Sequence, residues 1–182
     1  MYNNCMKKIY HSWQDVERQV QEILRQIQLS AWRPDYVVGL TRGGLVPANL
    51  ISQYLDCPME TLKVSLRDGG EPESNSWMAE DAFGGYTDPE NPKRYLHKNI
   101  LIVDDINDSG ATLNWIKHDW MSSCHPTNPM WQQIWQEHVK VAVLYDNESS
   151  KSELNIDYSA VTINKAEEDS WIVFPWEEFW KH

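Results

Sequence analysis

Three carboxylates and two hydroxyls stand close together in the segment LIVDDINDSGATL, residues 101–113. Asp104 and Asp105 come first, directly after an apolar run. The turn that follows consists of Asp108, Ser109, Gly110, Ala111 and Thr112. Such a turn into a helix directs backbone amides and hydroxyls at one point, which suits a phosphate group. Two adjacent carboxylates can accept hydrogen bonds from a vicinal diol and attract Mg²⁺. The segment therefore indicates a sugar phosphate as the ligand.

Each acid taken alone has a plainer explanation. Asp104 and Asp105 could simply end a strand, and Asp108 could cap the next helix. A phosphoacceptor receiver domain also places acids at strand ends, but it does not require the hydroxyl-bearing turn. The ordered set of residues favours the sugar-phosphate site over these alternatives.

A second unusual loop comes earlier in the chain. The β-branched run at 36–40 predicts a buried strand. The residues directly after it are Thr41, Arg42, Gly43 and Gly44. In open α/β sheets, ligands bind beyond the carboxyl ends of the strands. We therefore expect this loop and residues 104–112 to line one site.

Strands and helices alternate around these two loops. Helical spacing of apolar residues predicts helices at 13–29, 112–120 and 130–137. Pro47 is expected to open another helix, with a core face made of Leu50, Ile51, Tyr54 and Leu55. Strands are expected at 36–40, 61–66, 99–103, 139–145, 158–163 and 171–174. This alternation predicts an α/β fold with a mostly parallel central sheet flanked by helices.

Residues 67–98 do not fit that alternation. They contain two Gly-Gly pairs, three prolines and many acids, with no sustained hydrophobic period. A segment of this kind and length within a compact domain is typically a functional lid or a disordered loop. We predict a long mobile loop there.

Composition limits the classes of partner. The 182 residues fit one domain, 1–182, and carry a net charge of -11 with a pI near 4.9. The electrostatic field of this negative charge repels phosphate backbones and anionic lipid, so we expect neither nucleic acid nor a membrane as partner. Three cysteines without metal-binding spacing fit a reducing cytoplasm.

The segment 101–113 resembles the phosphoribosyl-pyrophosphate (PRPP) motif of type I phosphoribosyltransferases, with Ser109 in place of the usual first Thr. The run TRGGLVP, residues 41–47, is similar to the pyrophosphate loop of the xanthine-guanine and hypoxanthine members in bacteria and archaea. The run DSWIVFPWE, residues 169–177, resembles their C-terminal hood. The resemblance spans most of the chain from residue 36 to residue 177.

This resemblance implies the type I phosphoribosyltransferase fold, with a mobile lid at 67–98 and a hood region at 146–182. It implies transfer of the 5-phosphoribosyl group from PRPP to a purine base, yielding a nucleoside monophosphate and pyrophosphate in purine salvage. The resemblance to this branch favours a 6-oxopurine such as guanine, xanthine or hypoxanthine. Mg²⁺ is the implied cofactor and a homodimer the implied assembly.

The resemblance also assigns roles to single residues. Asp104 and Asp105 would bind the ribose hydroxyls and the metal. The 5′-phosphate would contact Asp108, Ser109, Gly110, Ala111 and Thr112, and the pyrophosphate would contact Thr41, Arg42, Gly43 and Gly44. Asp108 would also be the catalytic acid/base at the purine N7. Trp171 would stack on the base, and Ile172 would meet it through its backbone. The lid contacts could include Ser76 and Trp77.

One position departs from the 6-oxopurine members. They carry a Lys after the strand that corresponds to 139–145, where this chain has Asp146. An Asp accepts hydrogen bonds and would suit the amine of adenine, whereas Lys151 or the amide of Asn147 could still donate to an oxygen. Adenine or another base as acceptor, and a sensor that binds PRPP without turnover, therefore stay open as alternatives. Aromatic residues near Trp131 and Trp135, expected to be exposed, could serve the dimer interface.

Overall fold

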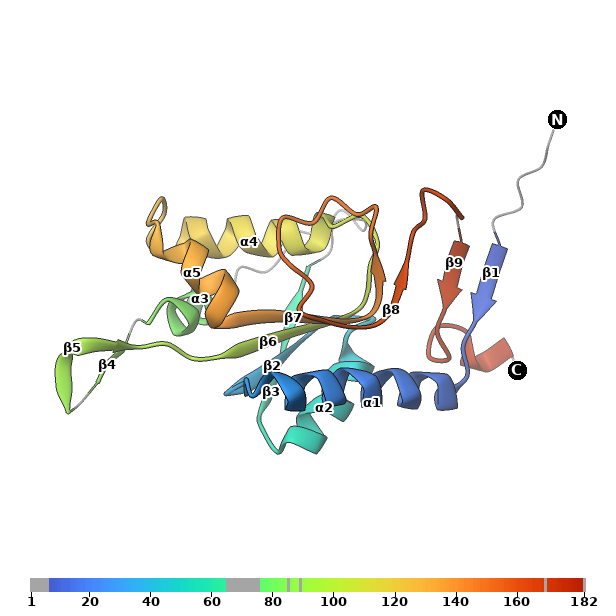
Figure 1. Cartoon of the computed structure of the whole chain (residues 1–182), viewed down its shortest axis with the longest axis horizontal. Coiled ribbons are helices and arrows are strands. Elements are labelled where there is room, and N and C mark those ends of the chain that lie inside the picture. The colour runs from blue at the N-terminus through green and yellow to red at the C-terminus, as the bar shows by residue number, and fades with distance from the viewer. Residues whose placement is uncertain (1–6, 65–75, 85, 89, 169, 182) are drawn as a thin grey trace.

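A five-stranded parallel sheet forms the centre of the protein (Figure 1). The computed structural model describes residues 7–64, 76–84, 86–88, 90–168 and 170–181. In spatial order the strands are β3 (Met59–Lys63), β2 (Tyr36–Thr41), β6 (Ile100–Asn107), β7 (Val139–Asn147) and β8 (Tyr158–Ile163). All four neighbouring pairs are parallel. The predicted α/β fold with a parallel sheet is confirmed.

Helices cover both faces of this sheet. The helices α1 (Trp13–Ser30) and α2 (Leu45–Leu55) pack on one face; α3 (Ser76–Phe83), α4 (Ala111–Ser123) and α5 (Met130–Glu137) pack on the other (Figure 1). Successive strand residues point to opposite faces. Thus Val37 and Leu101 join the core under α1 and α2, whereas Val38 joins the core under the other helices. The two faces bury separate apolar clusters, which explains why these strands are apolar throughout.

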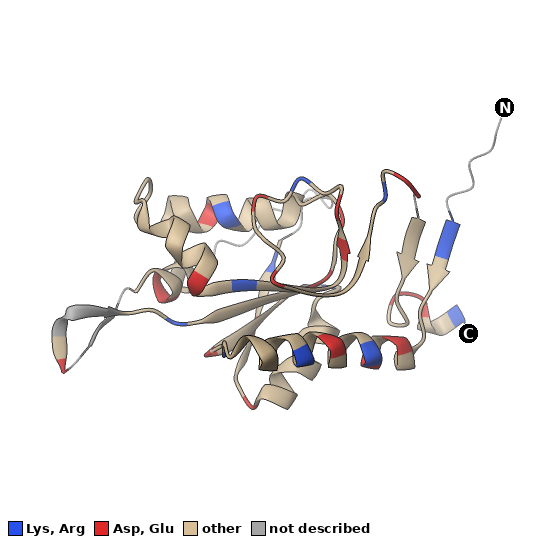
Figure 2. Cartoon of the chain, in the orientation of Figure 1, with Lys and Arg blue, Asp and Glu red and all other residues tan. Residues whose placement is uncertain are grey.

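The first helix begins where the sequence predicts. Ser12 and Asp15 form a complete capping box at its N-terminus. Acidic and basic residues alternate along its outer face (Figure 2), where ion pairs join Arg18 to Asp15 and Arg25 to Glu22. Within the described ranges, no helix has the length and apolar content needed to cross a bilayer.

The second helix buries only part of the predicted face: Ile51 and Leu55 are in the core as expected. Leu50 and Tyr54 are 42% and 58% exposed, whereas Ala48 and Ser52 are buried. Small residues face the sheet because the helix lies very close to β2: a Cβ on Gly39 would come within 2.9 Å of the Cβ of Ala48. Close approach therefore adds the small residues Ala48 and Ser52 to the buried face that Ile51 and Leu55 form.

The prediction of an exposed aromatic patch at Trp131 and Trp135 is wrong. Both side chains are buried, at 1% and 9% exposure, and Trp135 stacks on the fully buried Trp120. The indole of Trp131 also donates a hydrogen bond to the carbonyl oxygen of Cys124 at 2.8 Å. Part of the high tryptophan content therefore serves the core beneath α4 and α5.

The prediction of a single long loop at 67–98 is also wrong for much of that segment. Residues 76–83 form α3, and β4 (Tyr86–Asp88) and β5 (Asn91–Leu96) form an antiparallel hairpin. Residues 67–75 lie outside the described part of the chain. The helix forms because Met78, Ala79 and Ala82 give it one short apolar face, which is buried in the core with α4 and α5.

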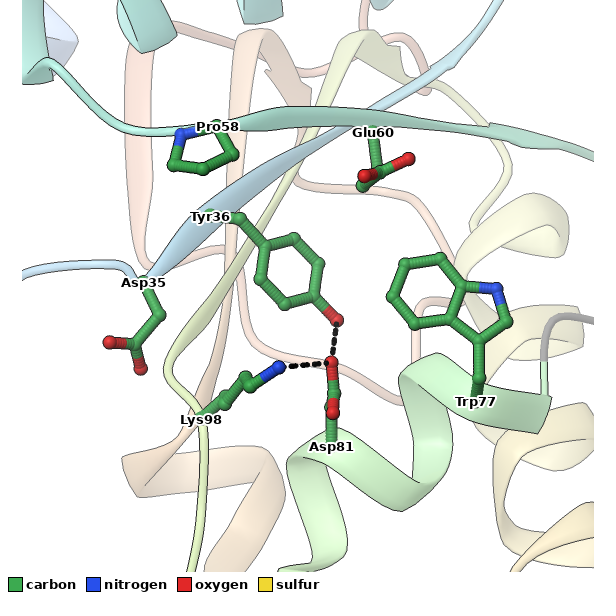
Figure 3. A pocket seen from close by; sticks show the side chains of 7 residues that line it. All are labelled: Asp35, Tyr36, Pro58, Glu60, Trp77, Asp81 and Lys98. Atoms are coloured by element: carbon green, nitrogen blue, oxygen red, sulfur yellow. Dashed lines mark hydrogen bonds and ion pairs between the residues drawn. The ribbon is translucent and has the colours of Figure 1, made fainter.

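A buried carboxylate fixes α3 to the sheet. Asp81 is 1% exposed, and its Oδ2 accepts hydrogen bonds from the Tyr36 hydroxyl at 3.2 Å and from Lys98 Nζ at 3.1 Å (Figure 3). These three residues border a small cavity of about 270 Å³, and Trp77 stacks on Tyr36 at its edge. Trp77 therefore lies at this cavity rather than at the 41–44 loop, contrary to the lid contact expected for it.

Replacing Asp81 with Asn is expected to destabilise the protein by about 1–2 kcal/mol, because the charge-assisted bond from Lys98 is lost. Urea unfolding followed by tryptophan fluorescence measures this change. Glu60→Gln is the matched control, since Glu60 borders the same cavity but is exposed. Equal unfolding midpoints for the two variants would show that Asp81 does not anchor α3.

The two terminal segments form a small sheet of their own. The strand β1 (Lys7–Tyr10) pairs in parallel with β9 (Ser170–Val173), beside the carboxyl edge of the central sheet (Figure 1). A short 3₁₀ helix, η1 (Phe179–Lys181), follows. The sequence does not predict β1, because two of its four residues are lysines and its pairing partner lies more than 160 positions away.

Candidate functional site

A cavity of about 940 Å³ opens at the carboxyl ends of the central strands. β2 pairs with β6 only as far as Gly39 and Val103, and β6 then continues to Asn107 beside β7 alone. Beyond this point α2 leaves on one face of the sheet and α4 on the other. A strand pair of this kind is a topological switch point, the usual ligand site of open α/β sheets.

The cavity brings together both loops expected from the sequence and the predicted hood residues. It is lined by Thr41, Arg42, Gly43, Asp104, Asp105, Asp108, Ser109, Gly110, Ala111, Thr112, Trp171 and Ile172. Of the predicted site residues, Gly44 is not among the lining residues. It lies beneath the loop, where a Cβ would be 2.3 Å from the carbonyl oxygen of Val103.

Gly43, in the predicted pyrophosphate loop, lies directly against Asp105. The peptide bond between Thr41 and Arg42 is cis. A Cβ on Gly43 would lie 2.0 Å from Oδ2 of Asp105, so only glycine permits this approach without movement of the carboxylate. The backbone of the 41–44 loop and the carboxylate of Asp105 therefore lie side by side in the cavity that Arg42 and Asp104 also line.

The two acids lie within β6 rather than after it. β6 runs to Asn107, four residues further than the sequence predicts, because β7 continues to pair with it. Burial raises the pKa of Asp104 well above its usual value, and the charge of Asp105 adds to this effect. Burial likewise raises the pKa of Asp105, to about 6. Two crowded carboxylates of this kind favour a ligand that brings positive charge.

The turn before α4 has the form of an anion site. Gly110 occupies the N-cap position with a φ of 82°, and as a glycine it has no side chain to cap the helix. The expected alternative, in which Asp108 merely caps the helix, is therefore wrong. Ser109 Oγ accepts a hydrogen bond from the amide of Ala111 at 3.3 Å, so its hydroxyl lies at the same turn. Uncapped amides at a helix N-terminus favour a phosphate group.

The structure adds a lysine that the sequence analysis missed. Lys165 Nζ donates to Oδ1 of Asp108 at 2.9 Å, and its side chain is only 13% exposed. It lines the same cavity. The sequence offered one signal for this role: Lys165 comes two residues after the predicted strand at 158–163, so it is expected at the carboxyl edge of the sheet. However, the sequence could not show that β8 lies close enough to β6 for the two to meet.

A buried asparagine connects the loops that carry this pair. Asn147, the last residue of β7, is 4% exposed. Its Nδ2 donates to the backbone oxygen of Asp108 at 2.8 Å, and its Oδ1 accepts from the backbone amide of Lys165 at 3.0 Å. Asn147 therefore bridges from β6 to β8 across the end of β7.

The other residues considered for the base have different environments. Asp146 Oδ1 accepts a hydrogen bond from Asn107 at 2.8 Å, and Asp146 does not line the cavity. The amide nitrogen of Asn147 is engaged by Asp108. Lys151 is exposed and lies outside the cavity lining. The alternatives require a side chain that reaches the base in the cavity, and none of these three residues lines the cavity.

The hood forms the remaining wall. Trp171 is 40% exposed at the cavity, whereas Ile172 is 6% exposed and packs into the core under α1. Phe174 and Trp176 stack face to face, with ring centroids 4.7 Å apart, and also line the wall. The half-exposed indole of Trp171 therefore offers an aromatic surface opposite the acidic loops.

The two acids do not form a complete metal site. Within the described residues, no cluster of three or more His, Cys, Asp or Glu side chains could hold a metal ion. Mg²⁺ prefers an octahedral shell of oxygens, often supplied partly by substrate phosphates. Asp104 and Asp105 fit a cation that arrives with an oxygen-rich ligand.

Comparisons with known proteins agree with this geometry. The model of the phosphoribosyl transferase domain family matches residues 6–181, so the chain belongs to that family. It is 27% identical over 177 residues to the xanthine-guanine phosphoribosyltransferase of Cereibacter sphaeroides. That alignment covers 94% of this chain and 87% of the relative. It is 24% identical over 195 residues to the hypoxanthine-guanine phosphoribosyltransferase of Schizosaccharomyces pombe, covering 93% and 89%.

A solved structure extends the agreement to the fold. The purine phosphoribosyltransferase from Pyrococcus horikoshii has a TM-score of 0.62 to this chain at 25% identity, and 96% of each chain is covered. The type I phosphoribosyltransferase fold expected from the sequence is confirmed.

Proposed function

We propose that the protein is an enzyme that transfers the 5-phosphoribosyl group of PRPP to a purine base, releasing pyrophosphate. The observation that carries the proposal is the cavity in which residues 41–43, the paired acids and the turn before α4 meet. These three features match the pyrophosphate, the ribose diol and the 5′-phosphate of PRPP. The family and the names of the relatives support the same reaction.

Each part of the donor has its own contacts in this proposal. Arg42 and the Gly43 backbone hold the pyrophosphate, because a guanidinium gives bidentate donors and glycine permits close approach. Asp104 and Asp105 accept hydrogen bonds from the ribose hydroxyls. The turn at 108–112 binds the 5′-phosphate through backbone amides at the N-terminus of α4.

Mg²⁺ fits the two carboxylates. Burial raises both pKa values, and the charge of Asp105 adds to this effect at Asp104; a divalent cation carried by PRPP would favour the charged form of both carboxylates. When bound, Mg²⁺ stabilises the negative charge that develops on the leaving pyrophosphate. The coordination oxygens beyond the two side chains come from the ligand.

The base lies between Trp171 and Asp108. The N9 lone pair attacks the anomeric carbon while the bond from that carbon to pyrophosphate breaks, and pyrophosphate leaves with the bonding electrons. A proton on N7 passes to the Asp108 carboxylate, which Lys165 holds in place. Charge builds at both the sugar and the leaving group, so electrostatic stabilisation supplies most of the catalysis.

A base screen tests this function. Purified protein with PRPP and Mg²⁺ is expected to release pyrophosphate with guanine, hypoxanthine or xanthine. Release with adenine alone would support the alternative acceptor. PRPP binding by calorimetry without release for any of the four bases would support the sensor and contradict the enzyme.

Two further expectations belong to the same proposal. A homodimer and a cytoplasmic location agree with the enzyme class. Size-exclusion chromatography with light scattering measures the assembly, and a monomer at working concentration would contradict the dimer.

A further inference from the structure

Lys165 occupies a specific place relative to the base. Its Nζ is 2.9 Å from Oδ1 of Asp108, and Lys165 lines the same cavity as Trp171 and Ile172. Asn147 fixes the backbones of both partners, so the spacing of the pair is set by a buried, hydrogen-bonded group. A lysine on an unrestrained loop would have no such defined position.

The chemistry of a purine edge matches this pair. N7 and the substituent on C6 lie next to each other on one edge of the ring. If the carboxylate of Asp108 faces N7, a cation hydrogen-bonded to that carboxylate lies beside the C6 substituent. Lys165 has three N–H donors and no acceptor, and the bond to Asp108 occupies one of them.

We infer that Lys165 reads the C6 position of the base and selects a 6-oxo group over a 6-amino group. The inference rests on the proposed function for the placement of N7 at Asp108. A carbonyl oxygen accepts a bond from the ammonium, whereas an exocyclic amine presents donors to it. The side chain is 13% exposed, so water replaces a missing acceptor poorly and the discrimination is large.

This assignment resolves the departure at Asp146. The donor for the C6 oxygen comes from the loop after β8 rather than from the loop after β7. Asp146 is turned toward Asn107 and lies outside the cavity lining, so its carboxylate does not offer an acceptor to adenine. The chain therefore combines an acid near the end of β7 with a 6-oxopurine donor from the loop after β8.

The test measures nucleotide binding, which does not require turnover. Inosine 5′-monophosphate and adenosine 5′-monophosphate differ at C6, and purine riboside 5′-monophosphate has no C6 substituent. Calorimetry on the wild-type protein is expected to give affinity for the inosine nucleotide about 10- to 100-fold higher than for either of the others, the range of a hydrogen bond to a charged group. Equal affinities for the inosine and purine riboside nucleotides would overturn the inference without any mutation.

Lys165→Met removes the donor, and Lys151→Met is the matched control. Lys165→Met is expected to lose the preference for the inosine nucleotide while PRPP affinity stays within about threefold, because PRPP has no base. Lys151→Met is expected to keep the preference, since that side chain is exposed outside the cavity. An unchanged preference in Lys165→Met would show that Lys165 only positions Asp108, and would overturn the inference.

The failure of the proposed function has a different signature. Absence of pyrophosphate release with every base refutes the transferase, yet the inosine-to-adenosine affinity ratio still reports whether Lys165 reads C6. Conversely, normal turnover with a base preference that Lys165→Met leaves unchanged refutes only the role of Lys165.

Discussion

Asp108→Asn is expected to lower kcat by about 10²- to 10⁴-fold, the usual contribution of a positioned acid/base group. The substitution keeps the size of the side chain but removes the group that receives the proton from N7. PRPP affinity should stay close to that of the wild type, because the amides of α4 and the 41–44 loop are untouched. Steady-state kinetics with the best base, together with PRPP calorimetry, measures both quantities.

Asp146→Asn is the control for this variant. It makes the same chemical change one strand away, at a residue outside the cavity lining. Its kcat should remain within about twofold of the wild type, as is typical of substitutions away from a site. A kcat for Asp108→Asn as high as that of Asp146→Asn would remove Asp108 from the proposed mechanism.

Gly110→Ala is expected to raise the KM for PRPP about 100-fold and to destabilise the protein by about 2–4 kcal/mol, through left-handed strain and a backbone clash. Gly110 has a φ of 82°, and an added Cβ would lie 2.3 Å from the backbone nitrogen of Ser152. The neighbour is backbone, so the turn itself must shift. Because that turn presents the amides for the 5′-phosphate, binding and stability fall together.

Gly84→Ala separates the effect of left-handed backbone strain from the effect of moving the turn that is proposed to bind the 5′-phosphate. Gly84 has a similar φ of 87° but does not line the cavity. It should show strain of about 1–2 kcal/mol in urea unfolding with an unchanged KM for PRPP. If Gly110→Ala matched Gly84→Ala in both measurements, the turn before α4 would not be the phosphate site.

The sequence predicted most of the fold because its elements carry local signals. The capping box at Ser12 fixed the start of α1, and the apolar strands at 36–40 and 139–145 indicated a parallel sheet. Misassigned elements lacked such signals. β1 is short and basic, and it pairs with the opposite end of the chain. The apolar face of α3 is only a few residues long, within a segment rich in glycine and acids.

Burial was harder to predict than secondary structure. Leu50 and Tyr54 are more apolar than Ala48 and Ser52, yet α2 buries the smaller pair because it packs closely on Gly39. Trp131 and Trp135 lie in a helix, α5, whose other residues are mostly Gln and Glu, but the two tryptophans are buried in the core beneath α4. Both outcomes depend on the distance between two packed elements, which a single-residue scale does not contain.

The sequence by itself determined the hydroxyl-bearing turn at 108–112, the paired acids and the glycine loop, because each is contiguous along the chain. Only the tertiary structure decided which cation meets Asp108. The order β6, β7, β8 brings the loop of Lys165 beside that of Asp108, and Asn147 fixes both across the end of β7. Such a pairing depends on strand order and loop path, and the spacing of residues along the chain carries neither.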